Sequence, residues 1–237
     1  MAEPAPRIDY YHWAGGREAL LRLGPERGML GTVLIAPALF EEANRLRGWT
    51  IALMRELAHR GVASVLPDLP GQGESVWKTE HCAVAKWRTA LATAAASLGK
   101  PHLFAIRGGT LLDGECLTAG RYHFAPVPGG DLIRDLVRIR QLSAEENDEA
   151  FNPEAIRPPG PPVELAGNIL SRWLIDDLKA AMPRTADRVA RPGTDARAAQ
   201  MRLTGTALWR RARPEEDRDL IGAVATDITR WVEQCEG

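Results

Sequence analysis

The sequence predicts an α/β domain in which a mostly parallel, twisted sheet carries helices on both faces. Three short apolar runs, at residues 31–36, 62–67 and 102–106, have the length and composition of strands that are buried on both faces. Segments with a helical pattern lie between them, at 49–60 and 83–98. Strands that alternate with helices pair in parallel through right-handed crossovers, and ligands then bind beyond the carboxyl ends of the strands.

Length and charge narrow the classes of function. A chain of 237 residues suits a single domain over 1–237. Thirty Lys and Arg residues face 31 Asp and Glu residues, a net charge of −1 that gives no electrostatic case for nucleic acid or an anionic membrane. No apolar stretch is long enough to span a bilayer, and the first residues lack the pattern of a signal peptide. We therefore expect a cytoplasmic protein without a membrane span or a nucleic-acid partner.

The cysteines and histidines suggest neither a disulfide framework nor a metal site. Cys82, Cys116 and Cys235 are an odd number and lie far apart, which favours a reducing compartment. The chain has no Cys-x-x-Cys pair and no histidine-rich run. We expect no metal and no other cofactor.

The N-terminal segment predicts an antiparallel hairpin, because residues 10–13 and 19–23 flank Gly15 and Gly16. A further strand of the main sheet is expected at 122–127.

Residues 131–162 are interpreted as an excursion or part of a lid. They begin with an amphipathic helix, in which Leu132, Leu136 and Ile139 form the buried face, and they continue into an acidic and then Pro-rich stretch.

Beyond this excursion a helix is expected at 164–182, and residues 184–198 give no clear pattern. A last strand is expected at 200–208. The tryptophans of this half, including Trp173, are expected to lie in the core.

The third apolar run leads into the motif that carries most information. In α/β-hydrolases the nucleophile lies on a sharp strand-to-helix turn with small residues two positions away on either side. Ala105-Ile106-Arg107-Gly108-Gly109 fits this nucleophile elbow in every respect except the nucleophile itself. A helix at 110–117 is expected to follow. The sequence therefore predicts the α/β-hydrolase fold with arginine where the catalytic serine belongs.

An arginine at this position removes the ordinary chemistry of the fold. A guanidinium group stays protonated at working pH and is a poor nucleophile. The catalytic histidine follows the last strand in α/β-hydrolases, yet no histidine lies beyond His123. Two parts of the Ser-His-Asp triad are thus expected to be missing, as in a pseudoenzyme.

Two interpretations of Arg107 remain open. If the turn places it at a helix N-terminus, the guanidinium and the free backbone N–H groups together suit a carboxylate or phosphate of a ligand or partner. Alternatively, Arg107 forms an internal salt bridge, for which Glu41 and Glu42 in the loop after residue 36 are the candidates. These acids could instead simply occupy the first turn of the next helix.

These motifs together resemble the hydrolase 2 group of the exosortase A system-associated hydrolases. The loop after the first apolar run matches that group through Glu41, Glu42, Asn44 and Arg47, with one extra residue between Pro37 and Phe40. Further matches lie in the loop after the second apolar run, the elbow, and the segments near 126–138 and 164–167: Asp68, Leu69, Gly71, Gly73, Ser75, Ile106, Arg107, Gly109, Pro126, Val127, Gly130, Val137, Arg138, Glu164, Ala166 and Gly167. Ala105 stands where the group is expected to have glycine.

The resemblance covers most of the chain and weakens after about residue 184. It implies the α/β-hydrolase fold and a bacterial setting with exopolysaccharide and protein-sorting genes, but it implies no mechanism.

The first functional hypothesis is an atypical homologue that binds a small acidic molecule, or a protein partner's carboxylate, through Arg107 and Gly108 in the elbow, framed by Glu41, Glu42 and Asn44. The alternative is an active esterase or acyltransferase with a non-standard nucleophile such as Ser75. A scaffold for secretion machinery is a third hypothesis.

Overall fold

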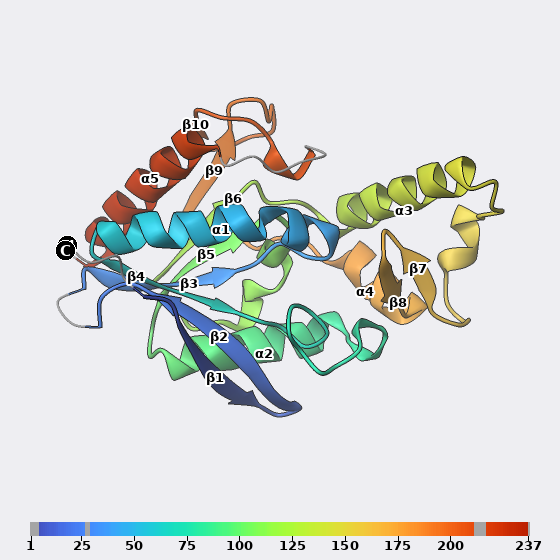
Figure 1. Ribbon diagram of the computed structural model, residues 1–237, viewed down its shortest axis with the longest axis horizontal. Coiled ribbons are helices and arrows are strands. Elements are labelled where there is room, and N and C mark those ends of the chain that lie inside the picture. Colours follow the sequence, from blue (N-terminus) through green and yellow to red (C-terminus); the bar gives the residue numbers. More distant parts are fainter. Residues whose placement is uncertain (1–4, 27–28, 211–216, 237) are drawn as a thin grey trace.

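The computed structural model describes residues 5–26, 29–210 and 217–236. An eight-stranded sheet runs through the molecule in the order β1-β2-β4-β3-β5-β6-β9-β10 (Figure 1). The pairs β1–β2 and β2–β4 are antiparallel, and every other neighbouring pair is parallel. The strands are β1 Arg7–Trp13, β2 Gly16–Leu23, β3 Gly31–Ala36, β4 Val62–Pro67, β5 His102–Ile106, β6 Gly120–Phe124, β9 Arg188–Pro192 and β10 Met201–Leu203.

Helices cover both faces of this sheet. The helices are α1 Glu41–His59, α2 Val84–Ser97, α3 Gly129–Glu146, α4 Arg172–Ala180 and α5 Arg218–Glu236. Side chains of α1 and α5 share one hydrophobic core, and those of α2, α3 and α4 share the other. The helices α3 and α4 project beyond one end of the sheet together with a small hairpin, β7 Val163–Leu165 and β8 Asn168–Leu170 (Figure 1). Among the described residues, no helix is both long and apolar enough to cross a membrane.

The elements that the hydrophobic pattern predicts most clearly are confirmed. The three buried runs form β3, β4 and β5 with the expected bounds, and all five residues of β5 are buried. In α1, Trp49, Leu53 and Leu57 form the buried stripe. The turn of the N-terminal hairpin lies between Trp13 and Gly16, as expected.

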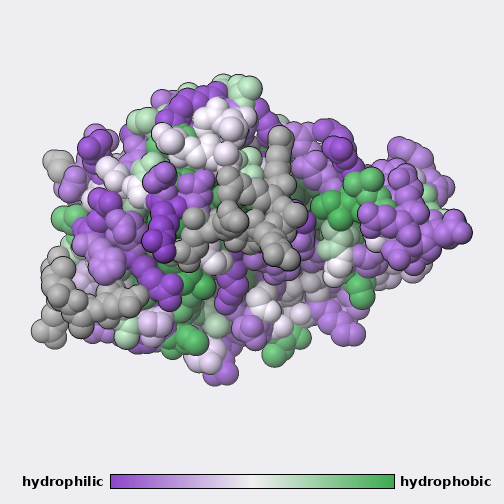
Figure 2. All heavy atoms as spheres, turned by 45° about the horizontal axis from the view of Figure 1, so that its top comes forward, coloured by the Kyte–Doolittle hydropathy of each residue, from purple (hydrophilic) through white to green (hydrophobic). Residues whose placement is uncertain are grey.

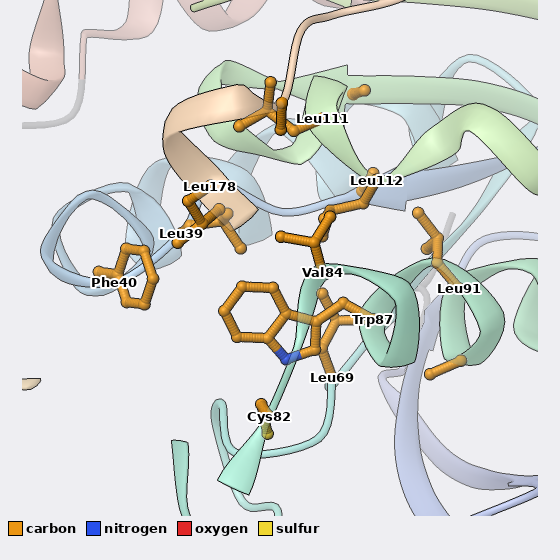
Figure 3. Packing of buried hydrophobic residues seen from close by; sticks show 14 of the residues in the cluster. Leu39, Phe40, Leu69, Cys82, Val84, Trp87, Leu91, Leu111, Leu112 and Leu178 are labelled. Atoms are coloured by element: carbon orange, nitrogen blue, oxygen red, sulfur yellow. The ribbon is translucent and has the colours of Figure 1, made fainter. Parts of the chain in front are cut away.

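Trp87 lies at the centre of the core on the α2 face, surrounded by Leu69, Val84 and Phe40 (Figure 3). The indole is fully buried, and its Nε1 donates a hydrogen bond of 2.7 Å to the carbonyl oxygen of Pro70. This bond attaches α2 to the loop that follows β4.

Replacing Trp87 by phenylalanine is expected to lower the free energy of unfolding by about 1–3 kcal/mol. The smaller ring leaves a cavity, and the Pro70 carbonyl loses its donor. Trp173→Phe is the matched control, because Trp173 is 67% exposed and its replacement should change stability by less than about 0.5 kcal/mol. Urea unfolding measures both variants, and equal effects would contradict the assignment of Trp87 to the core.

The exposure of Trp173 also corrects the expectation that it is a core residue. It lies in the first turn of α4, where Leu174 and Ile175 point inward instead.

The expected helix at 164–182 is wrong in its first half. Ala166 and Gly167 both have positive φ, 50° and 77°, and form the tight turn between β7 and β8. Helix α4 starts only after Ser171, whose Oγ accepts a hydrogen bond from the backbone N–H of Leu174 at 3.1 Å.

The last strands also differ from expectation. Strand β9 falls in the segment without a clear pattern, because two of its five residues are arginines. Arg188 pairs with Asp227 of α5, and Arg191 pairs with Asp195 at 2.7 Å, so both cations are compensated inside the fold. Strand β10 covers only Met201–Leu203 of the expected 200–208. Strand β6 ends at Phe124 rather than 127, because Ala125 has φ = 49° and leaves the extended conformation.

Candidate functional site

The elbow forms at the carboxyl end of β5, in the middle of the sheet. Arg107 follows the strand directly with φ = 51°, a left-handed conformation that is uncommon for a residue with a side chain. Thr110 Oγ1 donates a hydrogen bond of 2.7 Å to the Arg107 carbonyl oxygen and closes the turn. Strained backbone conformations cluster at active sites and ligand clamps, although they also occur in turns.

The small residue after the turn is required by the close approach of β3. A Cβ atom on Gly109 would lie 2.4 Å from the Pro37 carbonyl oxygen and 2.5 Å from that of Ala36. Any side chain here would collide with backbone, which cannot move aside as a flexible side chain can.

The segment after the elbow is not the helix expected at 110–117. It consists of two short 3₁₀ helices, Arg107–Leu111 and Asp113–Glu115. Three glycines between 108 and 114 disfavour an α-helix here. The argument that the dipole of a following α-helix attracts an anion to Arg107 is therefore wrong.

Arg107 itself is bound to a carboxylate of the protein. Its side chain is 2% exposed, and Nη2 donates to Glu42 Oε1 at 2.6 Å while Nε lies 3.1 Å from both carboxylate oxygens. Nη1 donates to the Ala125 carbonyl oxygen at 3.4 Å. The guanidinium stacks on the Trp209 ring, with Cζ 4.4 Å from the ring centroid. The arginine is thus held on several sides.

Both interpretations of the adjacent acids hold in part. Glu41 and Glu42 form the first turn of α1, where a negative charge is favourable. Only Glu42 also faces Arg107. Glu41 pairs with Arg45 one turn along the same helix, at 2.8 Å.

Two cavities lie beside the Arg107–Glu42 pair: Arg107 lines one, Glu42 lines the other, and Trp209 lines both. The first, here called the basic cavity, has a volume of about 280 Å³ and is lined by Arg107, Thr194, Asp195, Ala196, Arg197, Ala207 and Trp209. The second, here called the α3 cavity, has about 440 Å³ and is lined by Glu41, Glu42, Arg45, Leu132, Asp135, Leu136, Arg138, Ile139, Leu142 and Trp209.

The loop after β9 supplies the charges of the basic cavity. Burial acts to raise the pKa of Asp195, but hydrogen bonds from Arg191 and from the backbone N–H of Arg197 outweigh it, so the pKa lies below its ordinary value. Burial lowers the pKa of Arg191, and the charges of Arg197 and Arg107 act in the same direction. The charges of Arg107 and Arg197 therefore both act on Arg191.

Asp195 and Arg197 are the residues that sequence reasoning missed. Gly193, Thr194 and Asp195 form a turn at the carboxyl end of a parallel strand, which is where ligand-binding residues gather. The sequence contains this turn, but it can be recognised as a candidate site only after β9 has been identified.

The expected ligand-binding residues do not all meet. Arg107 lines the basic cavity, and Glu41 and Glu42 line the α3 cavity. Asn44 is exposed and lines a third, smaller cavity of about 70 Å³ together with Asp68. Gly108 is buried, and a Cβ there would lie 3.2 Å from side-chain atoms of Leu39 and Leu132.

The other candidate groups lie elsewhere. Ser75 Oγ accepts a hydrogen bond of 3.2 Å from the backbone N–H of Trp77, and Ser75 lines neither cavity. His123 is 1% exposed and lies 2.7 Å from the buried Asp113 carboxylate, so it is a paired core histidine. None of the five histidines, all of which are described, lines either cavity. Among the described residues, no group of three acids, histidines or cysteines could hold a metal ion.

No protein-family model matches the sequence, and no curated protein matches it significantly. Solved structures do match in fold. DcsB in complex with its substrate analogue gives a TM-score of 0.60 at 12% identity, covering 97% of this chain and 100% of that one. Est1E from Butyrivibrio proteoclasticus with ferulic acid bound gives 0.57 at 14% identity, covering 95% and 96%. The bottromycin epimerase BotH in complex with bottromycin A2 gives 0.53 at 12% identity, covering 95% and 99%.

At these identities the similarity shows the fold alone. The strand order, the elbow at the end of β5 and these neighbours agree, and the chain has the α/β-hydrolase fold.

Proposed function

We propose that this protein is an atypical α/β-hydrolase homologue that binds a small acidic ligand beside Arg107 and does not cleave it by serine chemistry. The observation that carries the proposal is the ion-paired guanidinium in the elbow. It occupies the place where the fold holds a nucleophile, and its bonds to Glu42 keep it there.

The surroundings support the loss of triad chemistry. Guanidinium does not deprotonate at working pH, so Arg107 cannot attack a carbonyl carbon. No histidine lines either cavity to act as a base. The acid of the triad lies between nucleophile and histidine in chain order. Between Arg107 and His123, the last histidine, Asp113 is a buried acid that pairs with His123, and neither residue lines either cavity.

The charges around the basic cavity favour an anion. Among the described residues, Arg107, Arg191 and Arg197 are opposed by two carboxylates, Glu42 and Asp195, which leaves one positive charge in excess. Arg197 is 40% exposed and can reach a bound molecule. A carboxylate or phosphate with a small polar body fits the volume of about 280 Å³.

The resemblance to the exosortase A-associated group suggests the ligand's setting, a bacterial cytoplasm in which exopolysaccharide precursors such as uronates occur. BotH, one structural neighbour, is described as an epimerase, so a protein of this fold need not be a hydrolase. Residues 131–162, most of which belong to the part that projects beyond the sheet, would act as the lid in this proposal.

Glucuronate, inorganic phosphate and neutral glucose are the probes for a calorimetric titration. We expect one site that binds an anionic probe, weakens with added salt and ignores glucose. Arg197→Ala should weaken binding about tenfold or more without changing the urea midpoint. Arg134→Ala, which removes a 75% exposed arginine of α3 outside both cavities, is the matched control. Equal affinity for glucose, or no effect of Arg197→Ala, would overturn the proposal.

The alternative of an active esterase or acyltransferase with a non-standard nucleophile has its own test. It requires turnover of p-nitrophenyl esters that Ser75→Ala abolishes. We expect no turnover, because Ser75 lies in neither cavity and no histidine is near enough to form a hydrogen bond with its hydroxyl within the described chain.

A further inference from the structure

The basic cavity contains a carboxylate beside its guanidinium groups, which is unexpected at a site that favours an anion. Asp195 lines the cavity, and its side chain is 11% exposed. Its Oδ2 accepts a hydrogen bond of 2.7 Å from Arg191 Nη1, and its Oδ1 accepts one of 3.1 Å from the backbone N–H of Arg197. Each oxygen of a carboxylate can accept more than one bond, so Asp195 can still accept a hydrogen bond from a ligand.

Arg191 holds this carboxylate in the wall of the cavity. The arginine is 6% exposed, and its Nε donates to the Ala198 carbonyl oxygen at 3.0 Å while its Nη2 donates to the Pro126 carbonyl oxygen at 2.9 Å. One guanidinium group thus connects the loop after β9, at Asp195 and at Ala198, to the segment that follows β6. The fold therefore fixes where Asp195 lies in the cavity.

Most charges at this site cancel in pairs. Arg107 pairs with Glu42, and Arg191 pairs with Asp195. The Nε atom of Arg197 lies 3.8 Å from Asp195 Oδ1, which is beyond hydrogen-bond reach. Among the described residues that line the cavity, Arg197 is thus the cation without a close carboxylate. A ligand with one negative charge balances it, whereas a second negative charge would lose its water without gaining a counter-charge.

Arg197 and Asp195 offer a ligand two complementary contacts. The guanidinium group donates and suits a carboxylate, whereas an ionised carboxylate only accepts and therefore suits a hydroxyl group. Burial acts to raise the pKa of Asp195, but the bonds from Arg191 and from the Arg197 N–H hold it below its ordinary value, so Asp195 is ionised near neutral pH. Since Nε and Oδ1 are 3.8 Å apart, the two groups of the ligand must lie on neighbouring or nearly neighbouring carbons.

We propose, building on the acid-binding site of the proposed function, that its ligand is a hydroxy acid with a single negative charge. The carboxylate binds Arg197, and a nearby hydroxyl donates to Asp195. Figure 2 shows mostly hydrophilic and intermediate side chains over the upper part of the molecule, where β9 and β10 lie, which suits a polar ligand. Simple aliphatic acids lack the hydroxyl donor, and phosphate esters carry a second charge. Asp195 is then the residue that determines the specificity of the site.

Two matched pairs of probes test this specificity by calorimetric titration at about pH 8, where a phosphate monoester is a dianion. Glucuronate and glucose 6-phosphate share a sugar ring and differ in the acidic group. The acids 2-hydroxyhexanoate and hexanoate differ by one hydroxyl. We expect glucuronate to bind on the order of tenfold more tightly than glucose 6-phosphate, because less charge is desolvated. We expect 2-hydroxyhexanoate to bind about tenfold more tightly than hexanoate, through the bond to Asp195.

Asp195→Asn keeps the shape of the side chain and removes its charge. Arg191 then has no counter-charge, and two positive charges are in excess at the site. Glucose 6-phosphate should therefore bind about tenfold or more tighter than to the unchanged protein, and the preference for glucuronate should disappear. Asp177→Asn is the matched control, because Asp177 is an exposed acid of α4 outside the basic cavity, and it should leave the preference unchanged. The urea midpoint of each variant shows whether its fold is retained.

The unchanged protein decides the proposal even if Asp195→Asn fails to fold. Equal affinities for glucuronate and glucose 6-phosphate would overturn the single-charge preference, and equal affinities for 2-hydroxyhexanoate and hexanoate would overturn the role of the hydroxyl. A folded Asp195→Asn protein that keeps the preference for glucuronate would show that Asp195 does not determine it. If none of the four acids binds, the acid-binding site itself is wrong and this inference with it, so the two proposals fail in different ways.

Discussion

Replacing Glu42 by alanine is expected to lower the free energy of unfolding by about 3–5 kcal/mol, because it leaves the Arg107 guanidinium buried without its counter-charge. Arg107 is 2% exposed, so its charge is left largely desolvated. The remaining acceptor, the Ala125 carbonyl oxygen, lies 3.4 Å from Nη1 and binds a different nitrogen. Urea unfolding followed by tryptophan fluorescence measures the change.

Glu41→Ala is the matched control for this prediction. Glu41 is the preceding residue in the same helical turn, its side chain is 32% exposed, and it pairs with Arg45 one turn away. Its loss should cost less than about 0.5 kcal/mol. Replacing both charged partners, as Glu42→Leu with Arg107→Met, should recover most of the stability, because no charge is then buried alone. Equal effects of Glu41→Ala and Glu42→Ala would show that the pair does not hold the elbow.

Gly109→Ala is the second large expected effect, about 3 kcal/mol or more of lost stability, at the upper end of what an overpacked core costs. The new methyl group would lie 2.4 Å from the Pro37 carbonyl oxygen and 2.5 Å from that of Ala36. Relieving this clash requires β3 and β5 to move apart in the centre of the sheet, which destabilises both the sheet and the elbow.

Gly48→Ala and Gly222→Ala control for the general effect of adding a methyl group to glycine. Both residues lie inside α-helices, α1 and α5, and a Cβ there would meet nothing within 4 Å. Each should stabilise the protein by about 0.5–1 kcal/mol, because alanine favours the helix. The opposite sign at 109 and at 48 is the expected result, and a neutral Gly109→Ala would mean that the elbow is not as tight as described.

Much of the fold follows from periodicity alone. The runs that became β3, β4 and β5 are mostly apolar because these strands are covered on both faces, so their bounds could be read directly. Strand β9 could not, because its arginines are compensated by Asp195 and Asp227, and those partners are distant or irregularly placed in sequence. The hairpin at 163–170 depends on a positive φ at Ala166, and an alanine in the sequence gives no indication of a positive φ.

The candidate site, too, could be predicted from the sequence only in part. The position of Arg107 followed from the elbow motif, whereas its pairing with an acid at 41 or 42 is one of two interpretations that the sequence leaves open. The choice of Glu42 over Glu41 did not follow from the sequence, since it depends on how α1 is rotated about its axis. The contact of Arg107 with the Trp209 ring joins residues 102 positions apart in the chain, and no local pattern predicts it.

A mass measurement on the intact protein tests the central claim, that this protein does not cleave by serine chemistry. The protein is incubated with an excess of a fluorophosphonate, which forms a covalent adduct with an activated serine, beside a serine hydrolase that reacts fully. The account predicts an unchanged mass, because the elbow position holds a guanidinium paired with Glu42 at 2.6 Å. A stoichiometric adduct on Ser75 or on any other serine would contradict it.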